Sequence, residues 1–385
     1  MVQGLRRVLV VGLARSGLAA REALERRGVE VIGADRQLGN DDDVRLLDGA
    51  DLLVKSPGVP GANPLVAGAR ERAIPVWSEV ELGYRLLGVR LVGVTGTNGK
   101  TTTSELLGAM LGAKVAGNVG RSLTALDGQV EPDELVVCEL SSFQLEDVAD
   151  LSCEVAVLLN LEPDHLDRHG TFEEYRAAKL RIFERAKHAV VPRGSGLPGV
   201  EFNADDPLPA EPLIPGRHNR ENAAAATAAA RLLGTPDEQI ARSLRTFPGV
   251  PHRLEPVAEI DGVRYVNDSK ATNVSAAVTG IAAYAAEPVH LILGGSRKGE
   301  DLAPLAAAIG PNVKSVHLIG ETAAELAAVL PDATRAGDLA AALAQIRAEP
   351  GDVVLLSPAC ASYDQFRDFE HRGEEFRRLV TNLEE

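Results

Sequence analysis

The sequence predicts an α/β protein of three domains, each built on a mainly parallel sheet flanked by helices. Its 385 residues exceed what one hydrophobic core usually supports. Short apolar runs alternate with helix-like segments along the chain, which indicates repeated strand–helix–strand units. The pattern starts again near residue 90 and near residue 251. We therefore expect domains at residues 1–89, 90–250 and 251–385.

Composition and charge narrow the class of protein. Apolar residues make up 45% and charged residues 25%, which is ordinary for a globular protein. The net charge of −15 argues against nonspecific binding to nucleic acid or to an anionic membrane. Cys138, Cys153 and Cys360 lack the paired spacing of a disulfide framework or zinc site. No apolar stretch approaches the roughly 18 residues of a membrane helix. We expect a cytoplasmic protein without membrane insertion.

The first domain begins like a Rossmann-type fold. Residues 8–11 read as a strand, 12–17 as a glycine loop, 18–27 as a helix and 29–34 as a second strand that ends at Asp35. Ala14 occupies the place of the middle glycine in a dinucleotide fingerprint, which disfavours a full NAD site. Asp41, Asp42 and Asp43 read as a solvated loop.

The second domain carries a candidate phosphate loop. A strand at 90–95 leads into glycine-rich residues 96–102 and then into a helix to residue 111. This arrangement points backbone N–H groups at one anion, although Val94 stands where the strict P-loop pattern has glycine. Lys100 would reach the β and γ phosphates of a nucleotide, and Thr101 would bind Mg²⁺. The alternative is an ordinary glycine turn with a structural lysine.

Other side chains of this domain are candidate metal ligands. Glu139 ends an apolar strand at 135–140, where it is either a Mg²⁺ ligand beside the phosphate loop or an exposed carboxylate. Oxygen and imidazole groups also follow the strand at 155–160. His165 and His169 have the spacing of a zinc pair, but no further suitable ligand stands nearby. Lys179, on a helix predicted over 172–185, reads by spacing alone as a solvated lysine.

The rest of the chain predicts a third α/β domain. Residues 192–216 hold six prolines and read as a loop, which precedes an Ala-rich helix at 219–233. Strands expected at 264–266, 290–293, 316–319 and 353–356 alternate with Ala-rich helices. Only 8 of the 40 basic residues are lysine. A lysine in this chain therefore draws attention wherever chemistry requires a primary amine.

Several motifs together resemble the Mur ligases, the ATP-dependent amide-forming enzymes of peptidoglycan precursor synthesis. They are Gly96-Thr-Asn-Gly-Lys-Thr-Thr102, Asn160-Leu-Glu-Pro-Asp-His165 and Tyr175-Arg-Ala-Ala-Lys179. Further segments are similar to the members that add D-glutamate, namely residues 117–120, 139–146, 251–253, 267–273 and 357–366. The order of domains in that family, UDP substrate, ATP and then amino acid, matches the boundaries expected above.

The resemblance implies an activity in the cytoplasmic steps of cell-wall synthesis, and so a role in cell shape and division. ATP would activate the carboxylate of UDP-MurNAc-L-Ala as an acyl phosphate, and D-glutamate would then attack it. Two Mg²⁺ ions are implied, one on Thr101 and Glu139 and one on His165 and a carbamylated Lys179. An amine can take up CO₂ in this way, whereas a guanidinium cannot. Small-molecule substrates and a monomer are expected.

The resemblance also implies binding residues. Lys100, Glu139, His165 and Lys179 would be catalytic. ATP would contact Gly96, Thr97, Asn98, Gly99, Lys100, Thr101, Thr102, Thr103, Asn219, Asn222, Arg253 and Asp268. The UDP substrate would contact Gly12, Ala14, Arg15, Ser16, Asp35, Arg36, Ser56, Pro57, Gly58, Asn118, Ser141, Gln144 and His165. D-Glutamate would contact Lys270, Thr272, Lys298, Ser362 and Phe369.

Two other functions compete with this interpretation. Another amide ligase, of the folylpolyglutamate synthase type, shares the phosphate loop but does not need residues 267–273 and 357–366 in this form. A nucleotide-dependent switch would bind ATP without making an amide, and the clustered metal ligands and third-domain cations argue against it. Cys360 as a nucleophile is disfavoured because no activating histidine is indicated.

Overall fold

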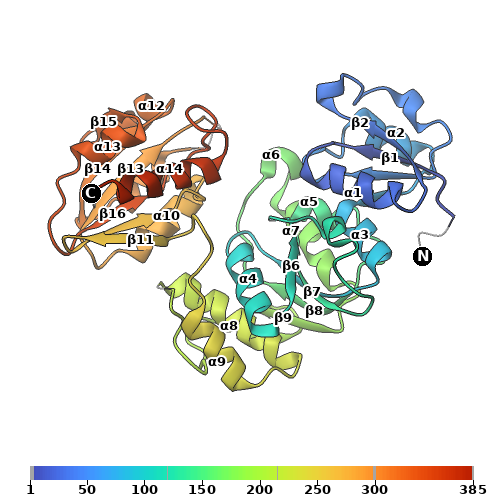
Figure 1. Ribbon diagram of the computed structural model, residues 1–385, viewed down its shortest axis with the longest axis horizontal. Helices are drawn as coiled ribbons and strands as arrows, with labels where there is room; N and C mark the ends of the chain where they lie inside the picture. Colours follow the sequence, from blue (N-terminus) through green and yellow to red (C-terminus); the bar gives the residue numbers. More distant parts are fainter. Residues whose placement is uncertain (1–3, 119, 215, 298–300, 384–385) are drawn as a thin grey trace. The chain divides into compact units, whose positions relative to one another are not determined.

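The computed structural model describes residues 4–118, 120–214, 216–297 and 301–383, and these contain three sheets flanked by helices (Figure 1). The expected α/β class with mainly parallel sheets is confirmed. By contacts the chain forms two compact units. One comprises residues 1–212 with 219–247 and holds the first two sheets. The other comprises residues 213–218 with 248–385 and holds the third.

The first sheet has four parallel strands in the order β2-β1-β3-β4. Its elements are β1 (Arg7–Val11), α1 (Arg15–Glu25), β2 (Glu30–Ala34), β3 (Leu52–Lys55), α2 (Pro64–Glu71), β4 (Val76–Ser78) and α3 (Glu79–Leu87), with 3-10 turns at Arg36–Leu38 and Val44–Leu47. Val8 and Val10 pack on one face, whereas Leu9 and Val11 pack on the other. Both faces are covered, so the strands are apolar throughout, as parallel strands usually are.

The second sheet has six parallel strands in the order β10-β9-β8-β5-β7-β6. Its elements are β5 (Arg90–Thr95), α4 (Lys100–Leu111), β6 (Lys114–Gly117), β7 (Leu135–Glu139), α5 (Ser142–Leu145), β8 (Cys153–Leu158), α6 (Leu166–His169), α7 (Phe172–Leu180), β9 (His188–Pro192), β10 (Val200–Phe202), α8 (Arg217–Leu232) and α9 (Asp237–Thr246), with 3-10 turns at Leu123–Leu126 and Arg181–Phe183. Helices α4, α8 and α9 share one core with the strands (Figure 1). Strand β5 lies inside the sheet, between β8 and β7, so its carboxyl end opens between two neighbouring strand ends.

Two expectations for this sheet are wrong in detail. The proline-rich stretch 192–216 contains the short edge strand β10, which pairs with β9. The helix expected over 172–185 ends at Leu180 and tightens into a 3-10 turn. At this turn the guanidinium of Arg181 donates to the carbonyl oxygens of Leu145, Glu146 and Val148. Because these contacts come from a distant loop, helical periodicity does not reveal them.

A buried ion-pair cluster joins the first sheet to the second. Lys55, at the end of β3, is fully buried and lies 2.5 Å from Asp147 and 3.1 Å from Glu146. Arg70 of α2 reaches the other oxygen of Asp147 at 2.8 Å. Together these charges fix the first sheet against the loop that follows α5.

The third sheet has the order β11-β12-β16-β13-β14-β15, with β11 alone antiparallel to its neighbour. Its elements are β11 (Glu255–Ile260), β12 (Val263–Asn267), α10 (Val274–Ala283), β13 (Val289–Gly294), α11 (Ala303–Ala308), β14 (Val313–Ile319), α12 (Ala323–Val329), β15 (Thr334–Gly337), α13 (Leu339–Gln345), β16 (Val353–Leu356) and α14 (Phe369–Thr381). Separate apolar cores cover its two faces. The loops after β12, β16 and β13 therefore emerge side by side.

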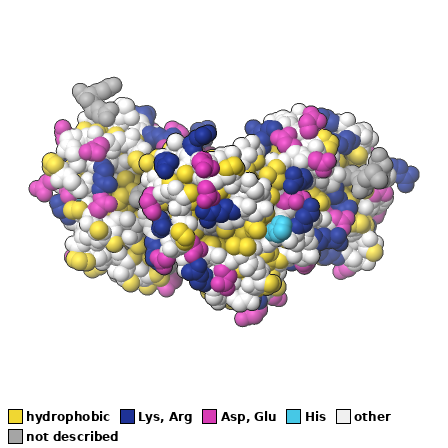
Figure 2. All heavy atoms as spheres, turned by 90° about the horizontal axis from the view of Figure 1, so that it is seen from below, with side chains coloured by type: hydrophobic (Ala, Val, Ile, Leu, Met, Phe, Trp, Pro, Cys, Tyr) yellow, Lys and Arg dark blue, Asp and Glu magenta, His cyan; other side chains and the backbone are white. Residues whose placement is uncertain are grey.

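Charged side chains of both signs lie on the surface. On the face drawn in Figure 2, basic and acidic side chains are interspersed rather than gathered by sign. Among the described helices, none is long and apolar enough to cross a membrane.

Candidate active site

The phosphate loop lies between β5 and α4. Gly99 has a φ of 82°, a left-handed conformation that favours glycine. A Cβ atom there would come within 2.2 Å of Oδ1 of Asn222 on α8. The loop therefore requires glycine at this position, and Asn222, one of the residues expected at ATP, lies directly against it.

Two lysines converge on the same part of this loop. Lys100 Nζ donates to the carbonyl oxygens of Gly96 at 2.9 Å and Thr97 at 2.7 Å, and Lys179 Nζ donates to the Gly96 oxygen at 2.8 Å. Burial and the positive charge of Lys100 lower the pKa of Lys179 to about 6. The side chain of Lys179 is 2% exposed. Its interpretation as a solvated helix lysine is therefore wrong, and at pH 7 it is mostly a neutral amine.

The segment after β8 braces the phosphate loop. Asn160 Oδ1 accepts from the backbone N–H of Asn98 at 2.8 Å, and Asn160 Nδ2 donates to the Asn98 oxygen at 3.2 Å. The hydroxyl of Thr97 lies 2.9 Å from the hydroxyl of Tyr175 and accepts from the N–H of Glu162 at 3.0 Å. The motif beginning at Asn160 thus holds the loop in shape, a role that its sequence does not reveal.

Glu139 has a buried carboxylate of the kind that suits a hard divalent cation. Glu139 ends β7 next to β5 and is 1% exposed. Its Oε1 accepts from Asn118 Nδ2 at 3.1 Å, but Oε2 has no hydrogen-bond partner among the described residues. A buried, unpaired carboxylate oxygen is costly unless a cation or donor satisfies it. Within the described chain no three His, Cys, Asp or Glu side chains form a metal-binding group, so Mg²⁺ here would take further oxygens from phosphate and water.

His165 and His169 have different surroundings. His165 caps α6 with a φ of 53°, and its Nε2 lies 3.5 Å from Asp164 Oδ2. His169 stacks on Phe143, while its ring nitrogens lie 2.9 Å from Ser142 Oγ and 3.3 Å from Glu146 Oε1. Protein partners thus occupy both nitrogens of His169, which disfavours the zinc alternative.

A pocket of about 760 Å³ opens at the carboxyl ends of the strands in the first sheet. Its lining residues include most of those expected at the UDP substrate: Gly12, Ala14, Arg15, Ser16, Asp35, Arg36, Ser56, Pro57, Gly58 and Asn118. Ser141 and Gln144 do not line this pocket; they form a capping box with each other at the start of α5.

Hydrogen bonds and close contacts fix the conformation of the glycine loop in this pocket. Asp35 accepts from the N–H groups of Gln37 at 2.8 Å and Leu13 at 2.6 Å, and these bonds lower the pKa of its carboxyl. Gly12 has a φ of 86°, and a Cβ there would come within 2.7 Å of Val59. Helix α1 has no side-chain cap and no acidic residue in its first turn. Its N-terminal N–H groups are therefore suited to an anion.

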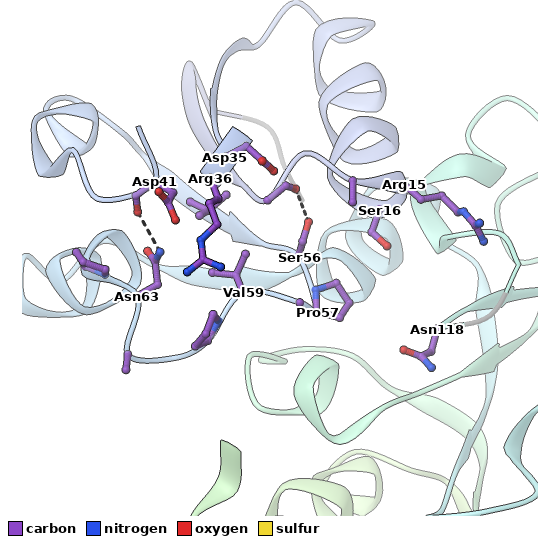
Figure 3. A pocket seen from close by; sticks show the side chains of 17 residues that line it. Arg15, Ser16, Asp35, Arg36, Asp41, Ser56, Pro57, Val59, Asn63 and Asn118 are labelled. Carbon is purple, nitrogen blue, oxygen red and sulfur yellow. Dashed lines mark hydrogen bonds between the residues drawn. The ribbon is translucent and has the colours of Figure 1, made fainter. Parts of the chain in front are cut away.

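The two ends of the pocket differ. In Figure 3, Arg36 extends into the pocket near Asp41 and Asn63, while Arg15 and Asn118 lie at the opposite end. Asn63 donates to the Asp41 backbone oxygen at 3.0 Å. Asp41 and Asp42 lie in a turn and Asp42 is exposed, as expected of a solvated loop, and this bond holds the turn beside the pocket.

Asn118 connects this pocket to Glu139, which lies beside the strand that leads into the phosphate loop. It lines the pocket and donates to Glu139, because the pairing of β6 with β7 places Gly117 opposite Glu139. Arg15 donates to the backbone oxygen of Gly120 at 3.1 Å and strengthens the same junction. A ligand that fills the pocket can thus present its Asn118 end toward Glu139.

The second compact unit holds the residues expected at D-glutamate. Lys270 Nζ lies 5.4 Å from the centre of the Phe369 ring, and Ser362 is buried. Lys298 lies outside the described residues. Asp268 accepts from Ser357 Oγ at 2.7 Å, and burial raises its pKa to about 7. The residues expected at ATP are divided, with Asn219 and Asn222 in the first unit and Arg253 and Asp268 in the second.

A glycine-rich strand–loop–helix segment with a buried carboxylate beside it, which one side chain joins to a second pocket, is typical of enzymes that activate a bound substrate with a nucleoside triphosphate. Comparison with known proteins agrees. Residues 94–196 match the Mur ligase middle domain, and residues 252–360 match the Mur ligase glutamate ligase domain.

Curated relatives and solved structures narrow the class. The UDP-N-acetylmuramoylalanine–D-glutamate ligase of Anaeromyxobacter dehalogenans is 43% identical to this chain, and the match covers 97% of both proteins. The ligase of the same name from Sphingopyxis alaskensis is 42% identical to this chain, and the match covers 98% of both proteins. The fold resembles UDP-N-acetylmuramate-alanine ligase of Thermotoga maritima, with a TM-score of 0.65, 18% identity, and 98% and 99% coverage of the two chains. MurF ligase of the same organism, in complex with ADP, has a TM-score of 0.60, 20% identity, and 100% and 97% coverage. The chain belongs to the Mur ligase family, in its branch of UDP-N-acetylmuramoylalanine–D-glutamate ligases.

Proposed function

We propose that this chain joins D-glutamate to UDP-N-acetylmuramoyl-L-alanine with ATP, forming ADP and phosphate. The observation that carries the proposal is the contact of Asn118 with Glu139, since it connects the pocket of the first sheet with the carboxylate beside the strand that leads into the phosphate loop. Residues 1–89 would bind the UDP substrate, 90–250 ATP and 251–385 D-glutamate. The enzyme would act as a cytoplasmic monomer.

The pocket would orient the UDP substrate along its length. The pyrophosphate suits the N-terminus of α1, and the uracil end would lie toward Asp35 and Arg36. The muramoyl-alanine end would then lie at Arg15 and Asn118. This orientation brings the substrate carboxylate to the edge of the sheet where the γ phosphate would lie.

In the first step, a substrate carboxylate oxygen attacks the γ phosphorus and ADP leaves. Two anions must approach one another, which is costly at low dielectric. Lys100 and the backbone N–H groups after Gly96 would hold the phosphates and stabilise the charge of the transition state. Mg²⁺, held by Thr101 and Glu139, would neutralise phosphate charge. In the second step, the amine of D-glutamate attacks the acyl carbon and phosphate leaves.

Lys179 has the chemistry to become a carbamate. Its neutral amine can add CO₂ and lose a proton, giving an anionic oxygen ligand. The low pKa and burial of Lys179 support this modification. With His165, the carbamate would hold a second Mg²⁺.

The amino-acid site would recognise a dicarboxylate. Lys270 and Lys298 supply positive charge, while Thr272, Ser362 and Phe369 would complete the pocket. Arg253 and Asp268 would contribute to ATP binding with Asn219 and Asn222.

A phosphate-release assay tests the proposal. We expect release from ATP only when UDP-N-acetylmuramoyl-L-alanine and D-glutamate are both present, together with one equivalent of amide product. Lys100→Ala should reduce the rate by orders of magnitude, whereas Lys114→Ala, at an exposed surface ion pair, should not. Release that ignores both substrates would indicate a nucleotide switch, and acceptance of a folate substrate instead would indicate the other ligase type.

A further inference from the structure

Arg372 is a wholly buried arginine in the second compact unit. It lies in the first turn of α14, is 0% exposed and is among the largest fully buried side chains of the described residues. Burying a guanidinium is expensive unless its N–H groups are satisfied. Its position on an otherwise amphipathic helix therefore needs an explanation.

The guanidinium of Arg372 donates hydrogen bonds only to neutral oxygens among the described residues, and the carboxylates of Asp268 and Asp364 act on it through their charge alone. Its Nε donates to Ser269 Oγ at 2.9 Å, and Nη2 donates to the Ser269 oxygen at 2.8 Å and the Cys360 oxygen at 3.1 Å. Its Nη1 donates to the oxygens of Cys360 and Ala361, each at 3.1 Å, and Gly294 at 3.4 Å. Among the described residues, none of its hydrogen bonds is to a carboxylate. The pKa falls only to about 10 because of burial, so the group stays charged at pH 7.

These partners come from three loops at one edge of the sheet. Ser269 follows β12, Gly294 ends β13, and Cys360 and Ala361 follow β16. Strands β12, β16 and β13 are neighbours, so the three loops emerge together. The planar guanidinium of Arg372, here called the fork, thus joins by hydrogen bonds three segments that are far apart in the sequence.

Each proposed contact of D-glutamate in the described loops is close in sequence to this fork. Lys270 follows Ser269, and Ser362 follows Ala361. Phe369 lies one turn before Arg372 on α14, and its oxygen accepts from Ser269 Oγ at 2.8 Å. A change at the fork would therefore move several pocket residues at once.

We propose that Arg372 is the positioning residue of the amino-acid pocket, because its hydrogen bonds hold in one arrangement the three loops that carry the pocket residues. The inference rests on the proposed function, since it assumes that this pocket receives D-glutamate. Arg372 acts from beneath the pocket through the three loops. A lysine could keep the charge, but it could not satisfy three loops with a planar fork.

Arg372→Lys tests the positioning role. We expect the KM for D-glutamate to rise at least tenfold, while the KM for ATP stays within twofold. The first step can be followed without D-glutamate by trapping the acyl phosphate with hydroxylamine, and its rate should also stay within twofold. Arg378→Lys is the matched control, because Arg378 lies on the same helix but is 57% exposed and pairs with Glu375. That control should leave all constants unchanged.

Chemical rescue supplies a second readout. In Arg372→Ala, ethylguanidinium should lower the KM for D-glutamate and ethylammonium should not, since only the former restores the fork. An unchanged KM for D-glutamate in Arg372→Lys would overturn the proposal. Equal losses of rate in acyl-phosphate formation and in amide formation would also overturn it, as would failure of both Arg372→Lys and Arg372→Ala to fold. Absence of product from the wild-type enzyme would instead contradict the proposed function.

Discussion

Lys100 and Lys179 donate to the same backbone oxygen, that of Gly96, at 2.9 and 2.8 Å. Two ammonium groups held so close repel one another, and the more buried group gives up its charge more readily. Lys179 is that group, with its pKa lowered to about 6. The segment between β5 and α4 thus places Lys100 next to a second, more buried lysine whose amine is mostly neutral at pH 7.

The first prediction concerns carbamylation of Lys179. The amine is mostly neutral above pH 6 and protonated below it, so carbamate formation, and with it the activity, should fall as the pH drops through 6. In buffers freed of CO₂ the activity at pH 7.5 should decline, and bicarbonate should restore it. After incubation with ¹³C-bicarbonate, a carbamate signal should appear in the ¹³C NMR spectrum of the wild-type protein.

Lys179→Arg keeps a basic side chain at this position but removes the primary amine. A guanidinium cannot form the carbamate, so we expect turnover to fall by orders of magnitude and the NMR signal to vanish. Lys187→Arg, at an exposed ion pair with Glu154, should change neither. Full activity in CO₂-free buffer with no carbamate signal would refute the modification.

Local patterns predicted the phosphate loop, whereas long-range partners decided much of the remaining site. Residues 90–111 form one continuous strand–loop–helix unit, so the local sequence alone predicts the loop at 96–102. Asn118 reaches Glu139 only because β6 pairs with β7, and before folding nothing but a resemblance points to it. Asp41 looks like a solvated acid, yet it lines a pocket. Arg372 cannot be told from a surface arginine until its partners, 11 to 103 residues away, are known.

The second prediction concerns Glu139, whose Oε2 is buried without a hydrogen-bond partner among the described residues. Glu139→Gln removes the anionic ligand but keeps the shape of the side chain. We expect the Mg²⁺ concentration for half-maximal activity to rise at least tenfold. The midpoint of thermal unfolding should stay the same or rise, because a buried charge is lost. Glu134→Gln, at a partly exposed ion pair with Lys114, is the control. An unaltered Mg²⁺ dependence would remove Glu139 from the metal site.

The third prediction concerns the buried ion pairs between the first two sheets. Lys55→Met leaves Asp147 with Arg70 and leaves Glu146 with His169. Breaking a buried pair on one side typically costs about 3–5 kcal/mol. Urea unfolding should show a loss of this order, while Lys187→Met, at an exposed pair, should lose less than about 1 kcal/mol. A loss as small as that of the control would show that the cluster contributes little to stability.

The last prediction concerns the pH dependence of stability through Glu79, which is fully buried at the start of α3. Its Oε1 accepts from the N–H and hydroxyl of Thr124, each at 2.6 Å, while Oε2 has no partner among the described residues. Burial raises the pKa of Glu79 from 4.5 to about 7. The folded protein therefore binds a proton that the unfolded chain releases, and the free energy of unfolding should fall as the pH rises from about 4.5 to 7. The loss from this group is on the order of 3 kcal/mol.

Glu79→Gln keeps an oxygen that can accept from Thr124 but cannot ionise. Its free energy of unfolding should depend less on pH over this range, and above pH 7 the variant should be at least as stable as the wild type. Urea unfolding of both proteins at pH 5 and pH 8 measures the difference. Glu184→Gln, at an exposed pair with Arg181, serves as the control and should keep the pH dependence of the wild type. If Glu79→Gln retains the full wild-type slope, the proton is bound elsewhere, and the junction of α3 with Thr124 holds an ionised carboxylate.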